Sequence, residues 1–323
     1  MSKIALCVNP MSGRDVRRLA ARASNMTHEA KRDIVARIAA GADSTGVSDI
    51  YVMREPFRIA ELALEHMPLS ANVHILDAPI KNDSRDTQEA IHRFIEMGCR
   101  TIVSLGGDGT NRAIVKSTSE IDLIPLSTGT NNVFPLSVEP TLAGIVAGLN
   151  AVGKITDDSL KSRSKVIYIE SAGIQDIALI DLVLLSNDQL GSLLPFKADN
   201  IRKLLLTRAE PASIGMSPIG GFIDPVYEDD DEGLLVDLSS GGRTFRAPLS
   251  PGLFGQVNVS SAERIKMDAR VLFEGPGVLA MDGDREIQLM SGQTASVSIR
   301  RDGPFVLKVD KAMRWAASNG IIS

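Results

Sequence analysis

The sequence has little of what would mark a secreted, membrane or disulfide-rich protein. Only two of its 323 residues are cysteine, and no apolar run approaches the ~18 residues that a membrane-spanning helix needs. Cys7 and Cys99 lie in or beside apolar stretches, so we expect buried thiols in a reducing compartment rather than a disulfide. The first residues begin a strand almost at once. We therefore expect no signal peptide, no integral membrane contact and a cytoplasmic location.

The net charge and the low aromatic content argue against a nucleic-acid-binding protein. The net charge is −5 and the isoelectric point is about 5.5, so we expect no general nucleic-acid binding. Aromatic residues make up only 4% of the chain and offer few platforms on which bases could stack. The histidines have no spacing typical of metal ligands; they are His28, His66, His74 and His92.

The most informative stretch contains two apolar strands that each run into a small polar loop. Thr101–Leu105 leads into the glycine-rich loop 106–110, with the sequence GGDGT, and Ile121–Leu126 leads into the loop 127–132, with the sequence STGTNN. In α/β folds, loops at the carboxyl ends of neighbouring parallel strands bind phosphate through free backbone N–H groups. The pattern therefore indicates a phosphate site.

The first loop adds a carboxylate to a glycine cradle. Its three glycines allow a sharp turn and close approach of a ligand, and we expect Thr110 to be the N-cap of a helix over Asn111–Lys116. Asp108 would repel a phosphate unless it holds Mg²⁺ or takes a proton from an attacking hydroxyl. The combination favours phosphoryl transfer over passive phosphate binding, the alternative being a plain strand-to-helix turn.

These motifs carry a family resemblance. GGDGT after a strand, followed by Thr-Gly-Thr-Asn-Asn, resembles the NAD kinase / diacylglycerol kinase superfamily. The form STGTNN-x-FP most resembles its ATP-NAD kinase-like branch, also called acetoin-catabolism protein X. The strand Lys3–Asn9 and the turn Asn9–Gly13 match the N-P-x-S-G element of that superfamily, where the resemblance implies nucleotide contact. It also implies ATP and Mg²⁺ as cofactors and a homo-oligomer.

The first half of the chain predicts an α/β, doubly wound, Rossmann-like domain over residues 1–150. Apolar strands alternate there with helical patterns of 10 to 15 residues, which is typical of a parallel sheet. Besides those already named, the expected elements are helices over Arg14–Ala40, Pro56–Met67 with Pro56 as its first residue, Asp83–Gly98 and Thr141–Leu149, and strands over Asp49–Met53 and Asn72–Asp77.

After residue 150 the pattern changes to short strand-like runs separated by Gly, Pro and Asp. This spacing predicts an all-β, sandwich-like second domain over residues 151–305, which would bind the substrate. The expected strands are Lys165–Glu170, Asp176–Ser186, Leu234–Leu238, Gly255–Val259, Val271–Phe273, Gly277–Ala280 and Ala295–Ile299. We also expect a helical insert over Phe196–Thr207, a solvated acidic loop over Glu228–Glu232, and a helix over Val309–Ser318 within a segment (306–323) that returns to the first domain.

Three acidic residues of the second half are further candidates. The resemblance implies that Asp282 or Asp284, in an Asp-Gly hairpin, contacts metal or substrate; a plain hairpin is the alternative. NAD kinases carry an Asn-Glu pair near the position of Asp181, which can stand for the acid. Ile180 replaces the amide, and this departure counts against NAD as the acceptor.

The leading hypothesis is an ATP-dependent small-molecule kinase that transfers the γ-phosphate to a ribose-type hydroxyl of NAD or a related nucleotide. Asp108 would be catalytic, and Mg²⁺ would be bound by Asp108 or Asp284. The predicted nucleotide- and phosphate-binding residues are Asn9, Gly106, Gly107, Gly109, Thr110, Thr128, Gly129, Thr130, Asn131 and Asn132. Asp181, Asp282 and Asp284 are the predicted substrate-binding residues.

Two alternatives remain open. The first is a non-catalytic NAD- or ATP-binding accessory or sensor protein of a catabolic, acetoin-type pathway. The second is a lipid kinase of the same superfamily. Against the lipid kinase, Ser127 replaces a glycine of that branch and Asn132 stands where an acid is usual. The sequence also lacks a basic amphipathic helix that could dock on a bilayer.

Overall fold

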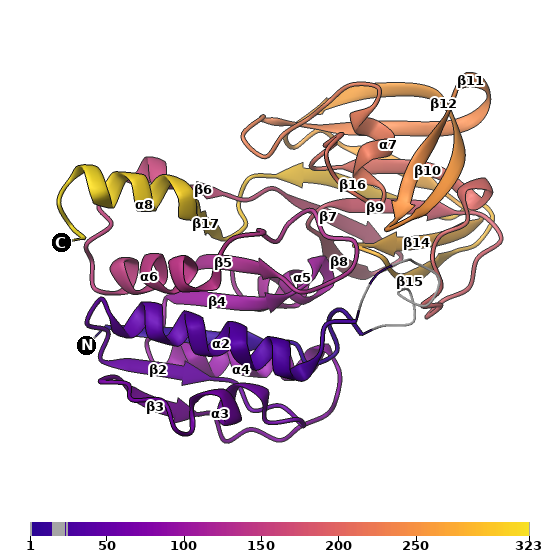
Figure 1. Cartoon of the computed structure of the whole chain (residues 1–323). Coiled ribbons are helices and arrows are strands. Elements are labelled where there is room, and N and C mark those ends of the chain that lie inside the picture. The colour runs from indigo at the N-terminus through magenta and orange to yellow at the C-terminus, as the bar shows by residue number, and fades with distance from the viewer. Residues whose placement is uncertain (1, 15–22, 24, 323) are drawn as a thin grey trace.

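The computed structural model describes residues 2–14, 23 and 25–322. Its first sheet has the strand order β3-β2-β1-β4-β5-β17-β6 (Figure 1). The strands β1 to β5 are mutually parallel, which confirms the predicted doubly wound α/β domain. Their bounds are Lys3–Val8, Asp49–Val52, Asn72–Ile75, Thr101–Gly106 and Asp122–Ser127 for β1 to β5, Lys161–Arg163 for β6 and Phe305–Leu307 for β17.

Helices cover both faces of this sheet. The helices α2 (His28–Asp43), α3 (Ile59–Leu64), α6 (Pro140–Ala151) and α8 (Val309–Ser318) lie on one face, and α4 (Ser84–Glu96) and α5 (Asp108–Ser117) lie on the other. Alternate residues of β1 point to opposite faces: Leu6 belongs to one core and Cys7 to the other. A strand that is buried on both sides must be apolar throughout, as β1 is.

Close approach of α2 and α6 depends on glycine. A Cβ atom on Gly144 would lie 2.1 Å from the carbonyl oxygen of Ile38, and one on Gly41 would lie 2.2 Å from the carbonyl oxygen of Thr141. Such distances leave no room for a side chain. The two helices can therefore contact each other backbone to backbone, which brings α6 close over the sheet.

The second domain is a sandwich of two antiparallel sheets, as predicted. One sheet has the order β12-β11-β10-β9-β14-β15 and the other β13-β16-β7-β8. Apolar side chains from both fill the space between them. The bounds are Val166–Ser171, Ile174–Ala178, Asp181–Leu185, Ile201–Leu206, Glu232–Ser250 and Leu253–Lys266 for β7 to β12, and Val271–Glu274, Gly277–Met281, Asp284–Leu289 and Thr294–Arg300 for β13 to β16.

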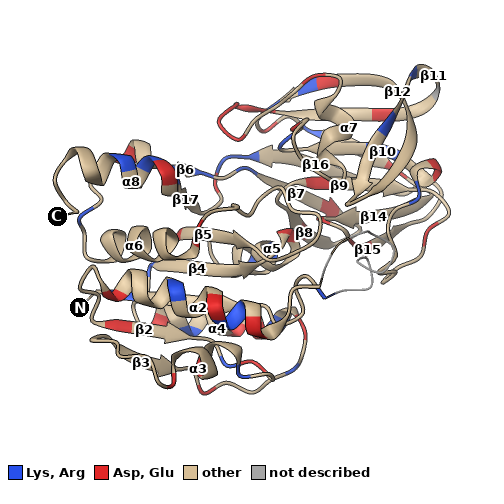
Figure 2. Cartoon of the chain, in the orientation of Figure 1, with Lys and Arg blue, Asp and Glu red and all other residues tan. Residues whose placement is uncertain are grey.

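The strands that precede and follow the sandwich in the chain, β6 and β17, belong to the first sheet. The strand β17 pairs in parallel with β5, and β6 pairs with β17, so both extend the first sheet. Helix α8 follows β17 and lies against α6, as predicted for the returning segment. Figure 2 shows acidic and basic residues interspersed along α2 and α8. Within the described ranges, the structure has no helix long and apolar enough to span a membrane.

Several predicted elements were wrong. The expected helix over Phe196–Thr207 is a single 3-10 turn (Ala198–Asn200) followed by β10, which pairs with β9 and β11 in the middle of a sheet. Pairing on both edges outweighs the helical preference of its Leu, Lys and Arg residues. The predicted strand Asp176–Ser186 is divided into β8 and β9 at Leu179–Ile180.

Helix boundaries in the first domain also differ from the prediction. Pro56 precedes α3 and is not its first residue, because Arg58 is the N-cap. The predicted helix over Arg14–Ala40 is observed only from His28, and residues 15–22 and 24 of that prediction lie outside the described part of the chain. Asp83 caps α4, and Gly98 follows its end with a φ of 82°, as expected of a helix terminator.

The acidic run Glu228–Glu232 is held by basic side chains and is not simply a solvated loop. The buried ammonium of Lys165 donates to the carbonyl oxygens of Tyr227, Asp230 and Glu232 at 2.8, 3.0 and 2.9 Å. Arg301 pairs with the carboxylate of Asp231 at 2.7 Å. These contacts fix the run against the second domain.

Candidate active site

The predicted loops converge at one edge of the first sheet, where they line a cavity of about 510 Å³. The hairpin between β14 and β15 closes it from the second domain. The sequence-predicted residues that line this cavity are Asn9, Gly107, Asp108, Gly109, Thr110, Gly129, Thr130, Asn131, Asn132, Asp282 and Asp284. Gly106 and Thr128 lie directly behind its wall, and Asp181 does not line it.

Asn9 and Thr128 tie the loops to one another. The Asn9 amide nitrogen donates to the Thr110 hydroxyl at 2.8 Å, and its oxygen accepts from the N–H groups of Met11 and Ser12 at 2.8 and 3.2 Å. The hydroxyls of Ser12 and Thr128 are 2.7 Å apart. The first, fourth and fifth strands therefore present their loops as one connected surface.

Two glycines of the GGDGT loop, Gly106 and Gly107, have close neighbours. A Cβ on Gly106 would lie 2.4 Å from the Thr110 side chain, and one on Gly107 would lie 2.8 Å from the Asn132 amide. Helix α5 begins at Asp108 with Gly107 as its N-cap, so Thr110 lies within the first turn and its prediction as N-cap was wrong. The N-terminus of α5 points its unpaired N–H groups and positive dipole at the cavity.

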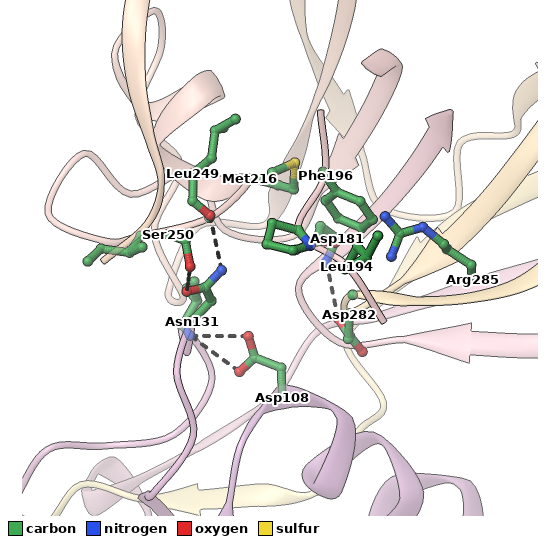
Figure 3. A pocket seen from close by; sticks show the side chains of 15 residues that line it. Asp108, Asn131, Asp181, Leu194, Phe196, Met216, Leu249, Ser250, Asp282 and Arg285 are labelled. Carbon is green, nitrogen blue, oxygen red and sulfur yellow. Dashed lines mark hydrogen bonds between the residues drawn. The ribbon is translucent and has the colours of Figure 1, made fainter. Parts of the chain in front are cut away.

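The second polar loop is braced within itself and against the second domain. The side-chain amide of Asn132 and the hydroxyl of Ser127 lie 2.8 Å apart, within hydrogen-bond distance. Asn131 donates to the carbonyl oxygen of Leu249 at 3.0 Å and accepts from the Ser250 hydroxyl at 3.0 Å (Figure 3). The side chain of Asn131 thus joins the two domains at the edge of the cavity.

Asp108 is a buried carboxyl held by backbone donors. It is 7% exposed, and it accepts from the N–H of Phe134 at 2.9 Å and from the N–H of Val133 at 3.2 Å. Burial, and then the negative charge of Asp282, raise the pKa of Asp108 to about 7, although the two N–H donors and Arg208 act in the opposite direction. A carboxyl with this pKa can accept a proton from a hydroxyl near neutral pH.

Asp282 supports the backbone between β8 and β9. Its carboxylate accepts from the N–H groups of Leu179, Ile180 and Asp181 at 2.8, 2.8 and 3.2 Å, and its φ is 48°. Burial raises the pKa of Asp282 above its ordinary value. The side chain of Ile180 is fully buried in the core beneath α4 and α5. The residue that replaces the amide of NAD kinases therefore does not line the cavity.

A second, smaller cavity of about 50 Å³ adjoins the large one, and Figure 3 shows the side chains that line it. Asp108, Asn131 and Asp282 line both cavities. Asp181 and Arg285 add polar groups from the second domain, and the remaining wall is mainly apolar, formed by Leu194, Pro195, Phe196, Ile214, Met216 and Leu249. Asp108 thus stands where the two spaces meet.

Sequence reasoning missed the far end of the large cavity. Glu55 and Phe57, which follow β2, line it, and the Phe57 ring lies 4.2 Å from that of His28. Lys31 is fully buried beneath the turn that follows β1, and it donates to the carbonyl oxygens of Asn9 and Pro10 at 2.7 and 2.8 Å. Residues 55–57 follow β2, which lies next to β1 in the sheet, and this position in the sequence could have indicated that they line the cavity.

The acidic residues fit a magnesium ion that arrives with a nucleotide. Within the described residues, no group of three or more His, Cys, Asp or Glu side chains could hold a metal alone. Mg²⁺ bound with phosphates needs only one or two carboxylates. Asp284 lies against the GGDGT loop, since a Cβ on Gly109 would be 3.3 Å from its Oδ2 atom.

A buried arginine joins the helix that follows this loop to the second domain. Arg112 of α5 is 3% exposed and makes two contacts with the Glu286 carboxylate, at 2.9 and 2.8 Å. It also pairs with Asp176 at 2.8 Å and donates to the carbonyl oxygen of Ile177 at 2.6 Å. These bonds fix the cavity wall that both domains share.

Comparison with known proteins agrees with this architecture. Residues 4–153 match the ATP-NAD kinase N-terminal domain, and residues 165–302 match the acetoin catabolism protein X C-terminal domain. The chain is 31% identical to acetoin catabolism protein X of Cupriavidus necator over 335 aligned positions, which cover 99% of this chain and 93% of that protein.

A solved structure shows the same fold. The structure of yeast NADH kinase complexed with NADH superposes with a TM-score of 0.57, covering 100% of this chain and 89% of the other at 14% identity. At that identity the likeness extends to the fold alone. Together with the domain matches and the full-length relative, it shows that the chain belongs to the acetoin catabolism protein X branch of the ATP-NAD kinase family.

Proposed function

We propose that the protein is an ATP-dependent small-molecule kinase that transfers the γ-phosphate to a ribose-type hydroxyl of NAD or a related nucleotide. The observation that carries the proposal is the position of Asp108, which lines both cavities. A group that accepts a proton from one substrate while the other is held by a glycine-rich loop must lie at such a junction.

ATP would occupy the large cavity. Its phosphates would accept from the N–H groups at the start of α5, over Gly107–Thr110, and its base would extend toward Phe57. Asp284, at the edge of the same loop, would hold Mg²⁺, which supplies neutralisation of phosphate charge when bound. Asp108 remains the second candidate ligand for the ion.

The chemical step needs one proton acceptor. As the acceptor hydroxyl oxygen forms its bond to the γ-phosphorus, its proton would pass to the Asp108 carboxylate, and the bond from phosphorus to the bridging oxygen would break to release ADP. Asp108 is suited to this because its pKa of about 7 keeps a large fraction ionised at neutral pH. Asp181 and Arg285, in the small cavity, would orient the acceptor.

The test measures transfer of ³²P from [γ-³²P]ATP with Mg²⁺ and a panel of acceptors, beginning with NAD. The wild-type protein is compared with Asp108→Asn, and nucleotide binding is followed by thermal shift. Label on NAD that disappears in the variant while ATP binding persists is the expected result. Label on a different acceptor would retain the kinase and reject NAD.

One observation favours a non-catalytic NAD or ATP sensor as the second candidate. Ile180 is buried, and Asn131 uses its amide to join the domains, so fewer polar groups face a dinucleotide than the family pattern provides. Absence of transfer to any acceptor, with NAD or ATP still raising the melting temperature, would select this candidate.

A further inference from the structure

We propose that Arg208, contributed by the second domain, is a positioning residue that holds Asp108 in its catalytic place; this rests on the function proposed above. The link is the backbone of Val133. Its N–H lies 3.2 Å from both carboxylate oxygens of Asp108, and its carbonyl oxygen accepts from Nη1 of Arg208 at 3.2 Å. The backbone of Val133 thus accepts a hydrogen bond from Arg208 through its carbonyl oxygen and donates one to Asp108 through its N–H.

Arg208 also contacts the second residue that donates to Asp108. The Phe134 N–H is 2.9 Å from Oδ1 of Asp108, and the guanidinium carbon of Arg208 lies 5.5 Å from the centroid of the Phe134 ring. Val133 and Phe134 provide the N–H groups that hold this carboxylate. A shift of either residue would therefore move the acid.

The arginine itself has little freedom. It is 8% exposed, and its Nη2 pairs with the Glu228 carboxylate at 3.0 Å. Glu228 is held from its other oxygen by Lys308, at 3.0 Å, immediately before α8. The chain of contacts from Lys308 through Glu228 and Arg208 to Val133 thus connects the returning segment with the catalytic carboxyl.

Such a support matters for rate more than for nucleotide affinity. A proton acceptor must lie within about 0.5 Å of its productive position, and a misplacement of about 1 Å can lower the rate roughly 100-fold. The phosphate-binding N–H groups at the start of α5 do not depend on Arg208. Its loss should therefore lower kcat and leave the KM for ATP nearly unchanged.

The experiment compares Arg208→Gln with a matched control, Arg301→Gln. Arg301 donates to the carbonyl oxygens of Glu228 and Asp230 at 3.0 and 2.8 Å, so it holds the same acidic segment but does not touch Val133. We expect kcat to fall roughly 10- to 100-fold in Arg208→Gln and to stay near the wild-type value in Arg301→Gln. Equal kcat values in the two variants, or a defect of Arg208→Gln confined to the KM for ATP, would overturn the assignment.

A second readout does not depend on turnover. Amide hydrogen exchange of Val133 and Phe134, followed by NMR, reports whether both N–H groups remain bonded to Asp108. We expect exchange to accelerate roughly tenfold in Arg208→Gln but not in Arg301→Gln. If the wild-type protein transfers no phosphate, the proposed function fails, and the exchange rates of the Val133 and Phe134 amides alone test the positioning role of Arg208. Unchanged exchange in Arg208→Gln would reject that role.

Should Arg208→Gln fail to fold, Glu228→Ala tests the same chain of contacts. This variant removes the carboxylate that holds Arg208 and leaves the arginine in place. Faster exchange of the Val133 and Phe134 amides, with lower kcat, supports the assignment. Wild-type values for both would overturn it.

Discussion

Replacing Asp108 by Asn should stabilise the protein at pH 8 while abolishing phosphate transfer. The structure sets the magnitude, because burial and the charge of Asp282 raise the pKa of Asp108 from 3.8 to about 7. Each pKa unit is worth about 1.4 kcal/mol, so keeping this buried carboxylate ionised costs up to about 4 kcal/mol of folding stability. An asparagine carries no charge, and its side-chain oxygen can still accept from the Phe134 N–H.

The sign of the pH dependence follows from the two pKa values. Asp108 binds its proton more tightly in the folded chain than in the unfolded chain, so from about pH 4 to about pH 7 the folded state holds more protons. The free energy of unfolding therefore falls as pH rises through this window. At pH 5 the Asp108 carboxyl is protonated in the folded state, so Asp108→Asn is more stable than wild type by only part of the full difference. At pH 8 the carboxyl is ionised, and the variant shows the full difference in free energy of unfolding.

Urea denaturation of both proteins at pH 5 and pH 8 measures this difference, since pH effects shared by the two proteins cancel. Asp83→Asn is the control of opposite sign. Asp83 is exposed, and its bond to Arg85 lowers its folded pKa from 3.8 to about 2, so the stability added by its ionised form is complete above about pH 4 and is lost as pH falls toward 2. The reasoning is refuted if Asp108→Asn is no more stable than wild type at pH 8, or if its advantage is the same at both pH values.

Four further outcomes follow from the geometry. Gly144→Ala places a methyl group 2.1 Å from the Ile38 carbonyl oxygen, so urea denaturation should show a loss of about 2 to 3 kcal/mol; unchanged stability would contradict the close helix contact. Arg112→Gln removes the buried guanidinium between Glu286 and Asp176 and leaves Lys116 as their cationic partner at the domain junction; it should cost about 3 kcal/mol by the same assay, more than an exposed arginine variant. Ile180→Asn restores the amide of the NAD kinase pattern but buries it in an apolar core, so the free energy of unfolding should fall by about 2 to 3 kcal/mol. NAD binding, measured by calorimetry, should not become tighter, and a tighter complex would mean that this residue reaches the cavity. Removing Mg²⁺ with EDTA should stop transfer and leave the melting temperature of the nucleotide-free protein unchanged, and a large drop would indicate a metal held by the protein alone.

The location of the candidate site was predictable where it depends on residues close together in the sequence. Asp108 within three glycines is a local signal, and so is the polar loop 127–132; both lie where the strand pattern put them. Thr110 shows the limit of such reasoning. It has the side chain of an N-cap, but its hydroxyl binds Asn9 from inside the helix, a contact set by the position of another strand.

Features that depend on distant residues could not be predicted. The partner of Arg112 is 174 residues away, and nothing in the sequence near either residue indicates the pairing. The same holds for Arg208, whose acceptor on Val133 is 75 residues earlier. The Leu, Lys and Arg residues of β10 favour a helix, and only its pairing with β9 and β11 makes it a strand.

The insertion of β17 into the first sheet has a consequence for synthesis on the ribosome. A nascent chain emerges from its N-terminus, so β5 is made long before β17, its partner in the sheet, is available. One edge of β5 stays open to solvent or to other chains until residue 307 has left the exit tunnel, and the apolar surface later covered by α8 stays open until residue 318 has done so. The first domain is thus encoded first but completed last, and a chain truncated before Phe305 would be prone to aggregate through that edge.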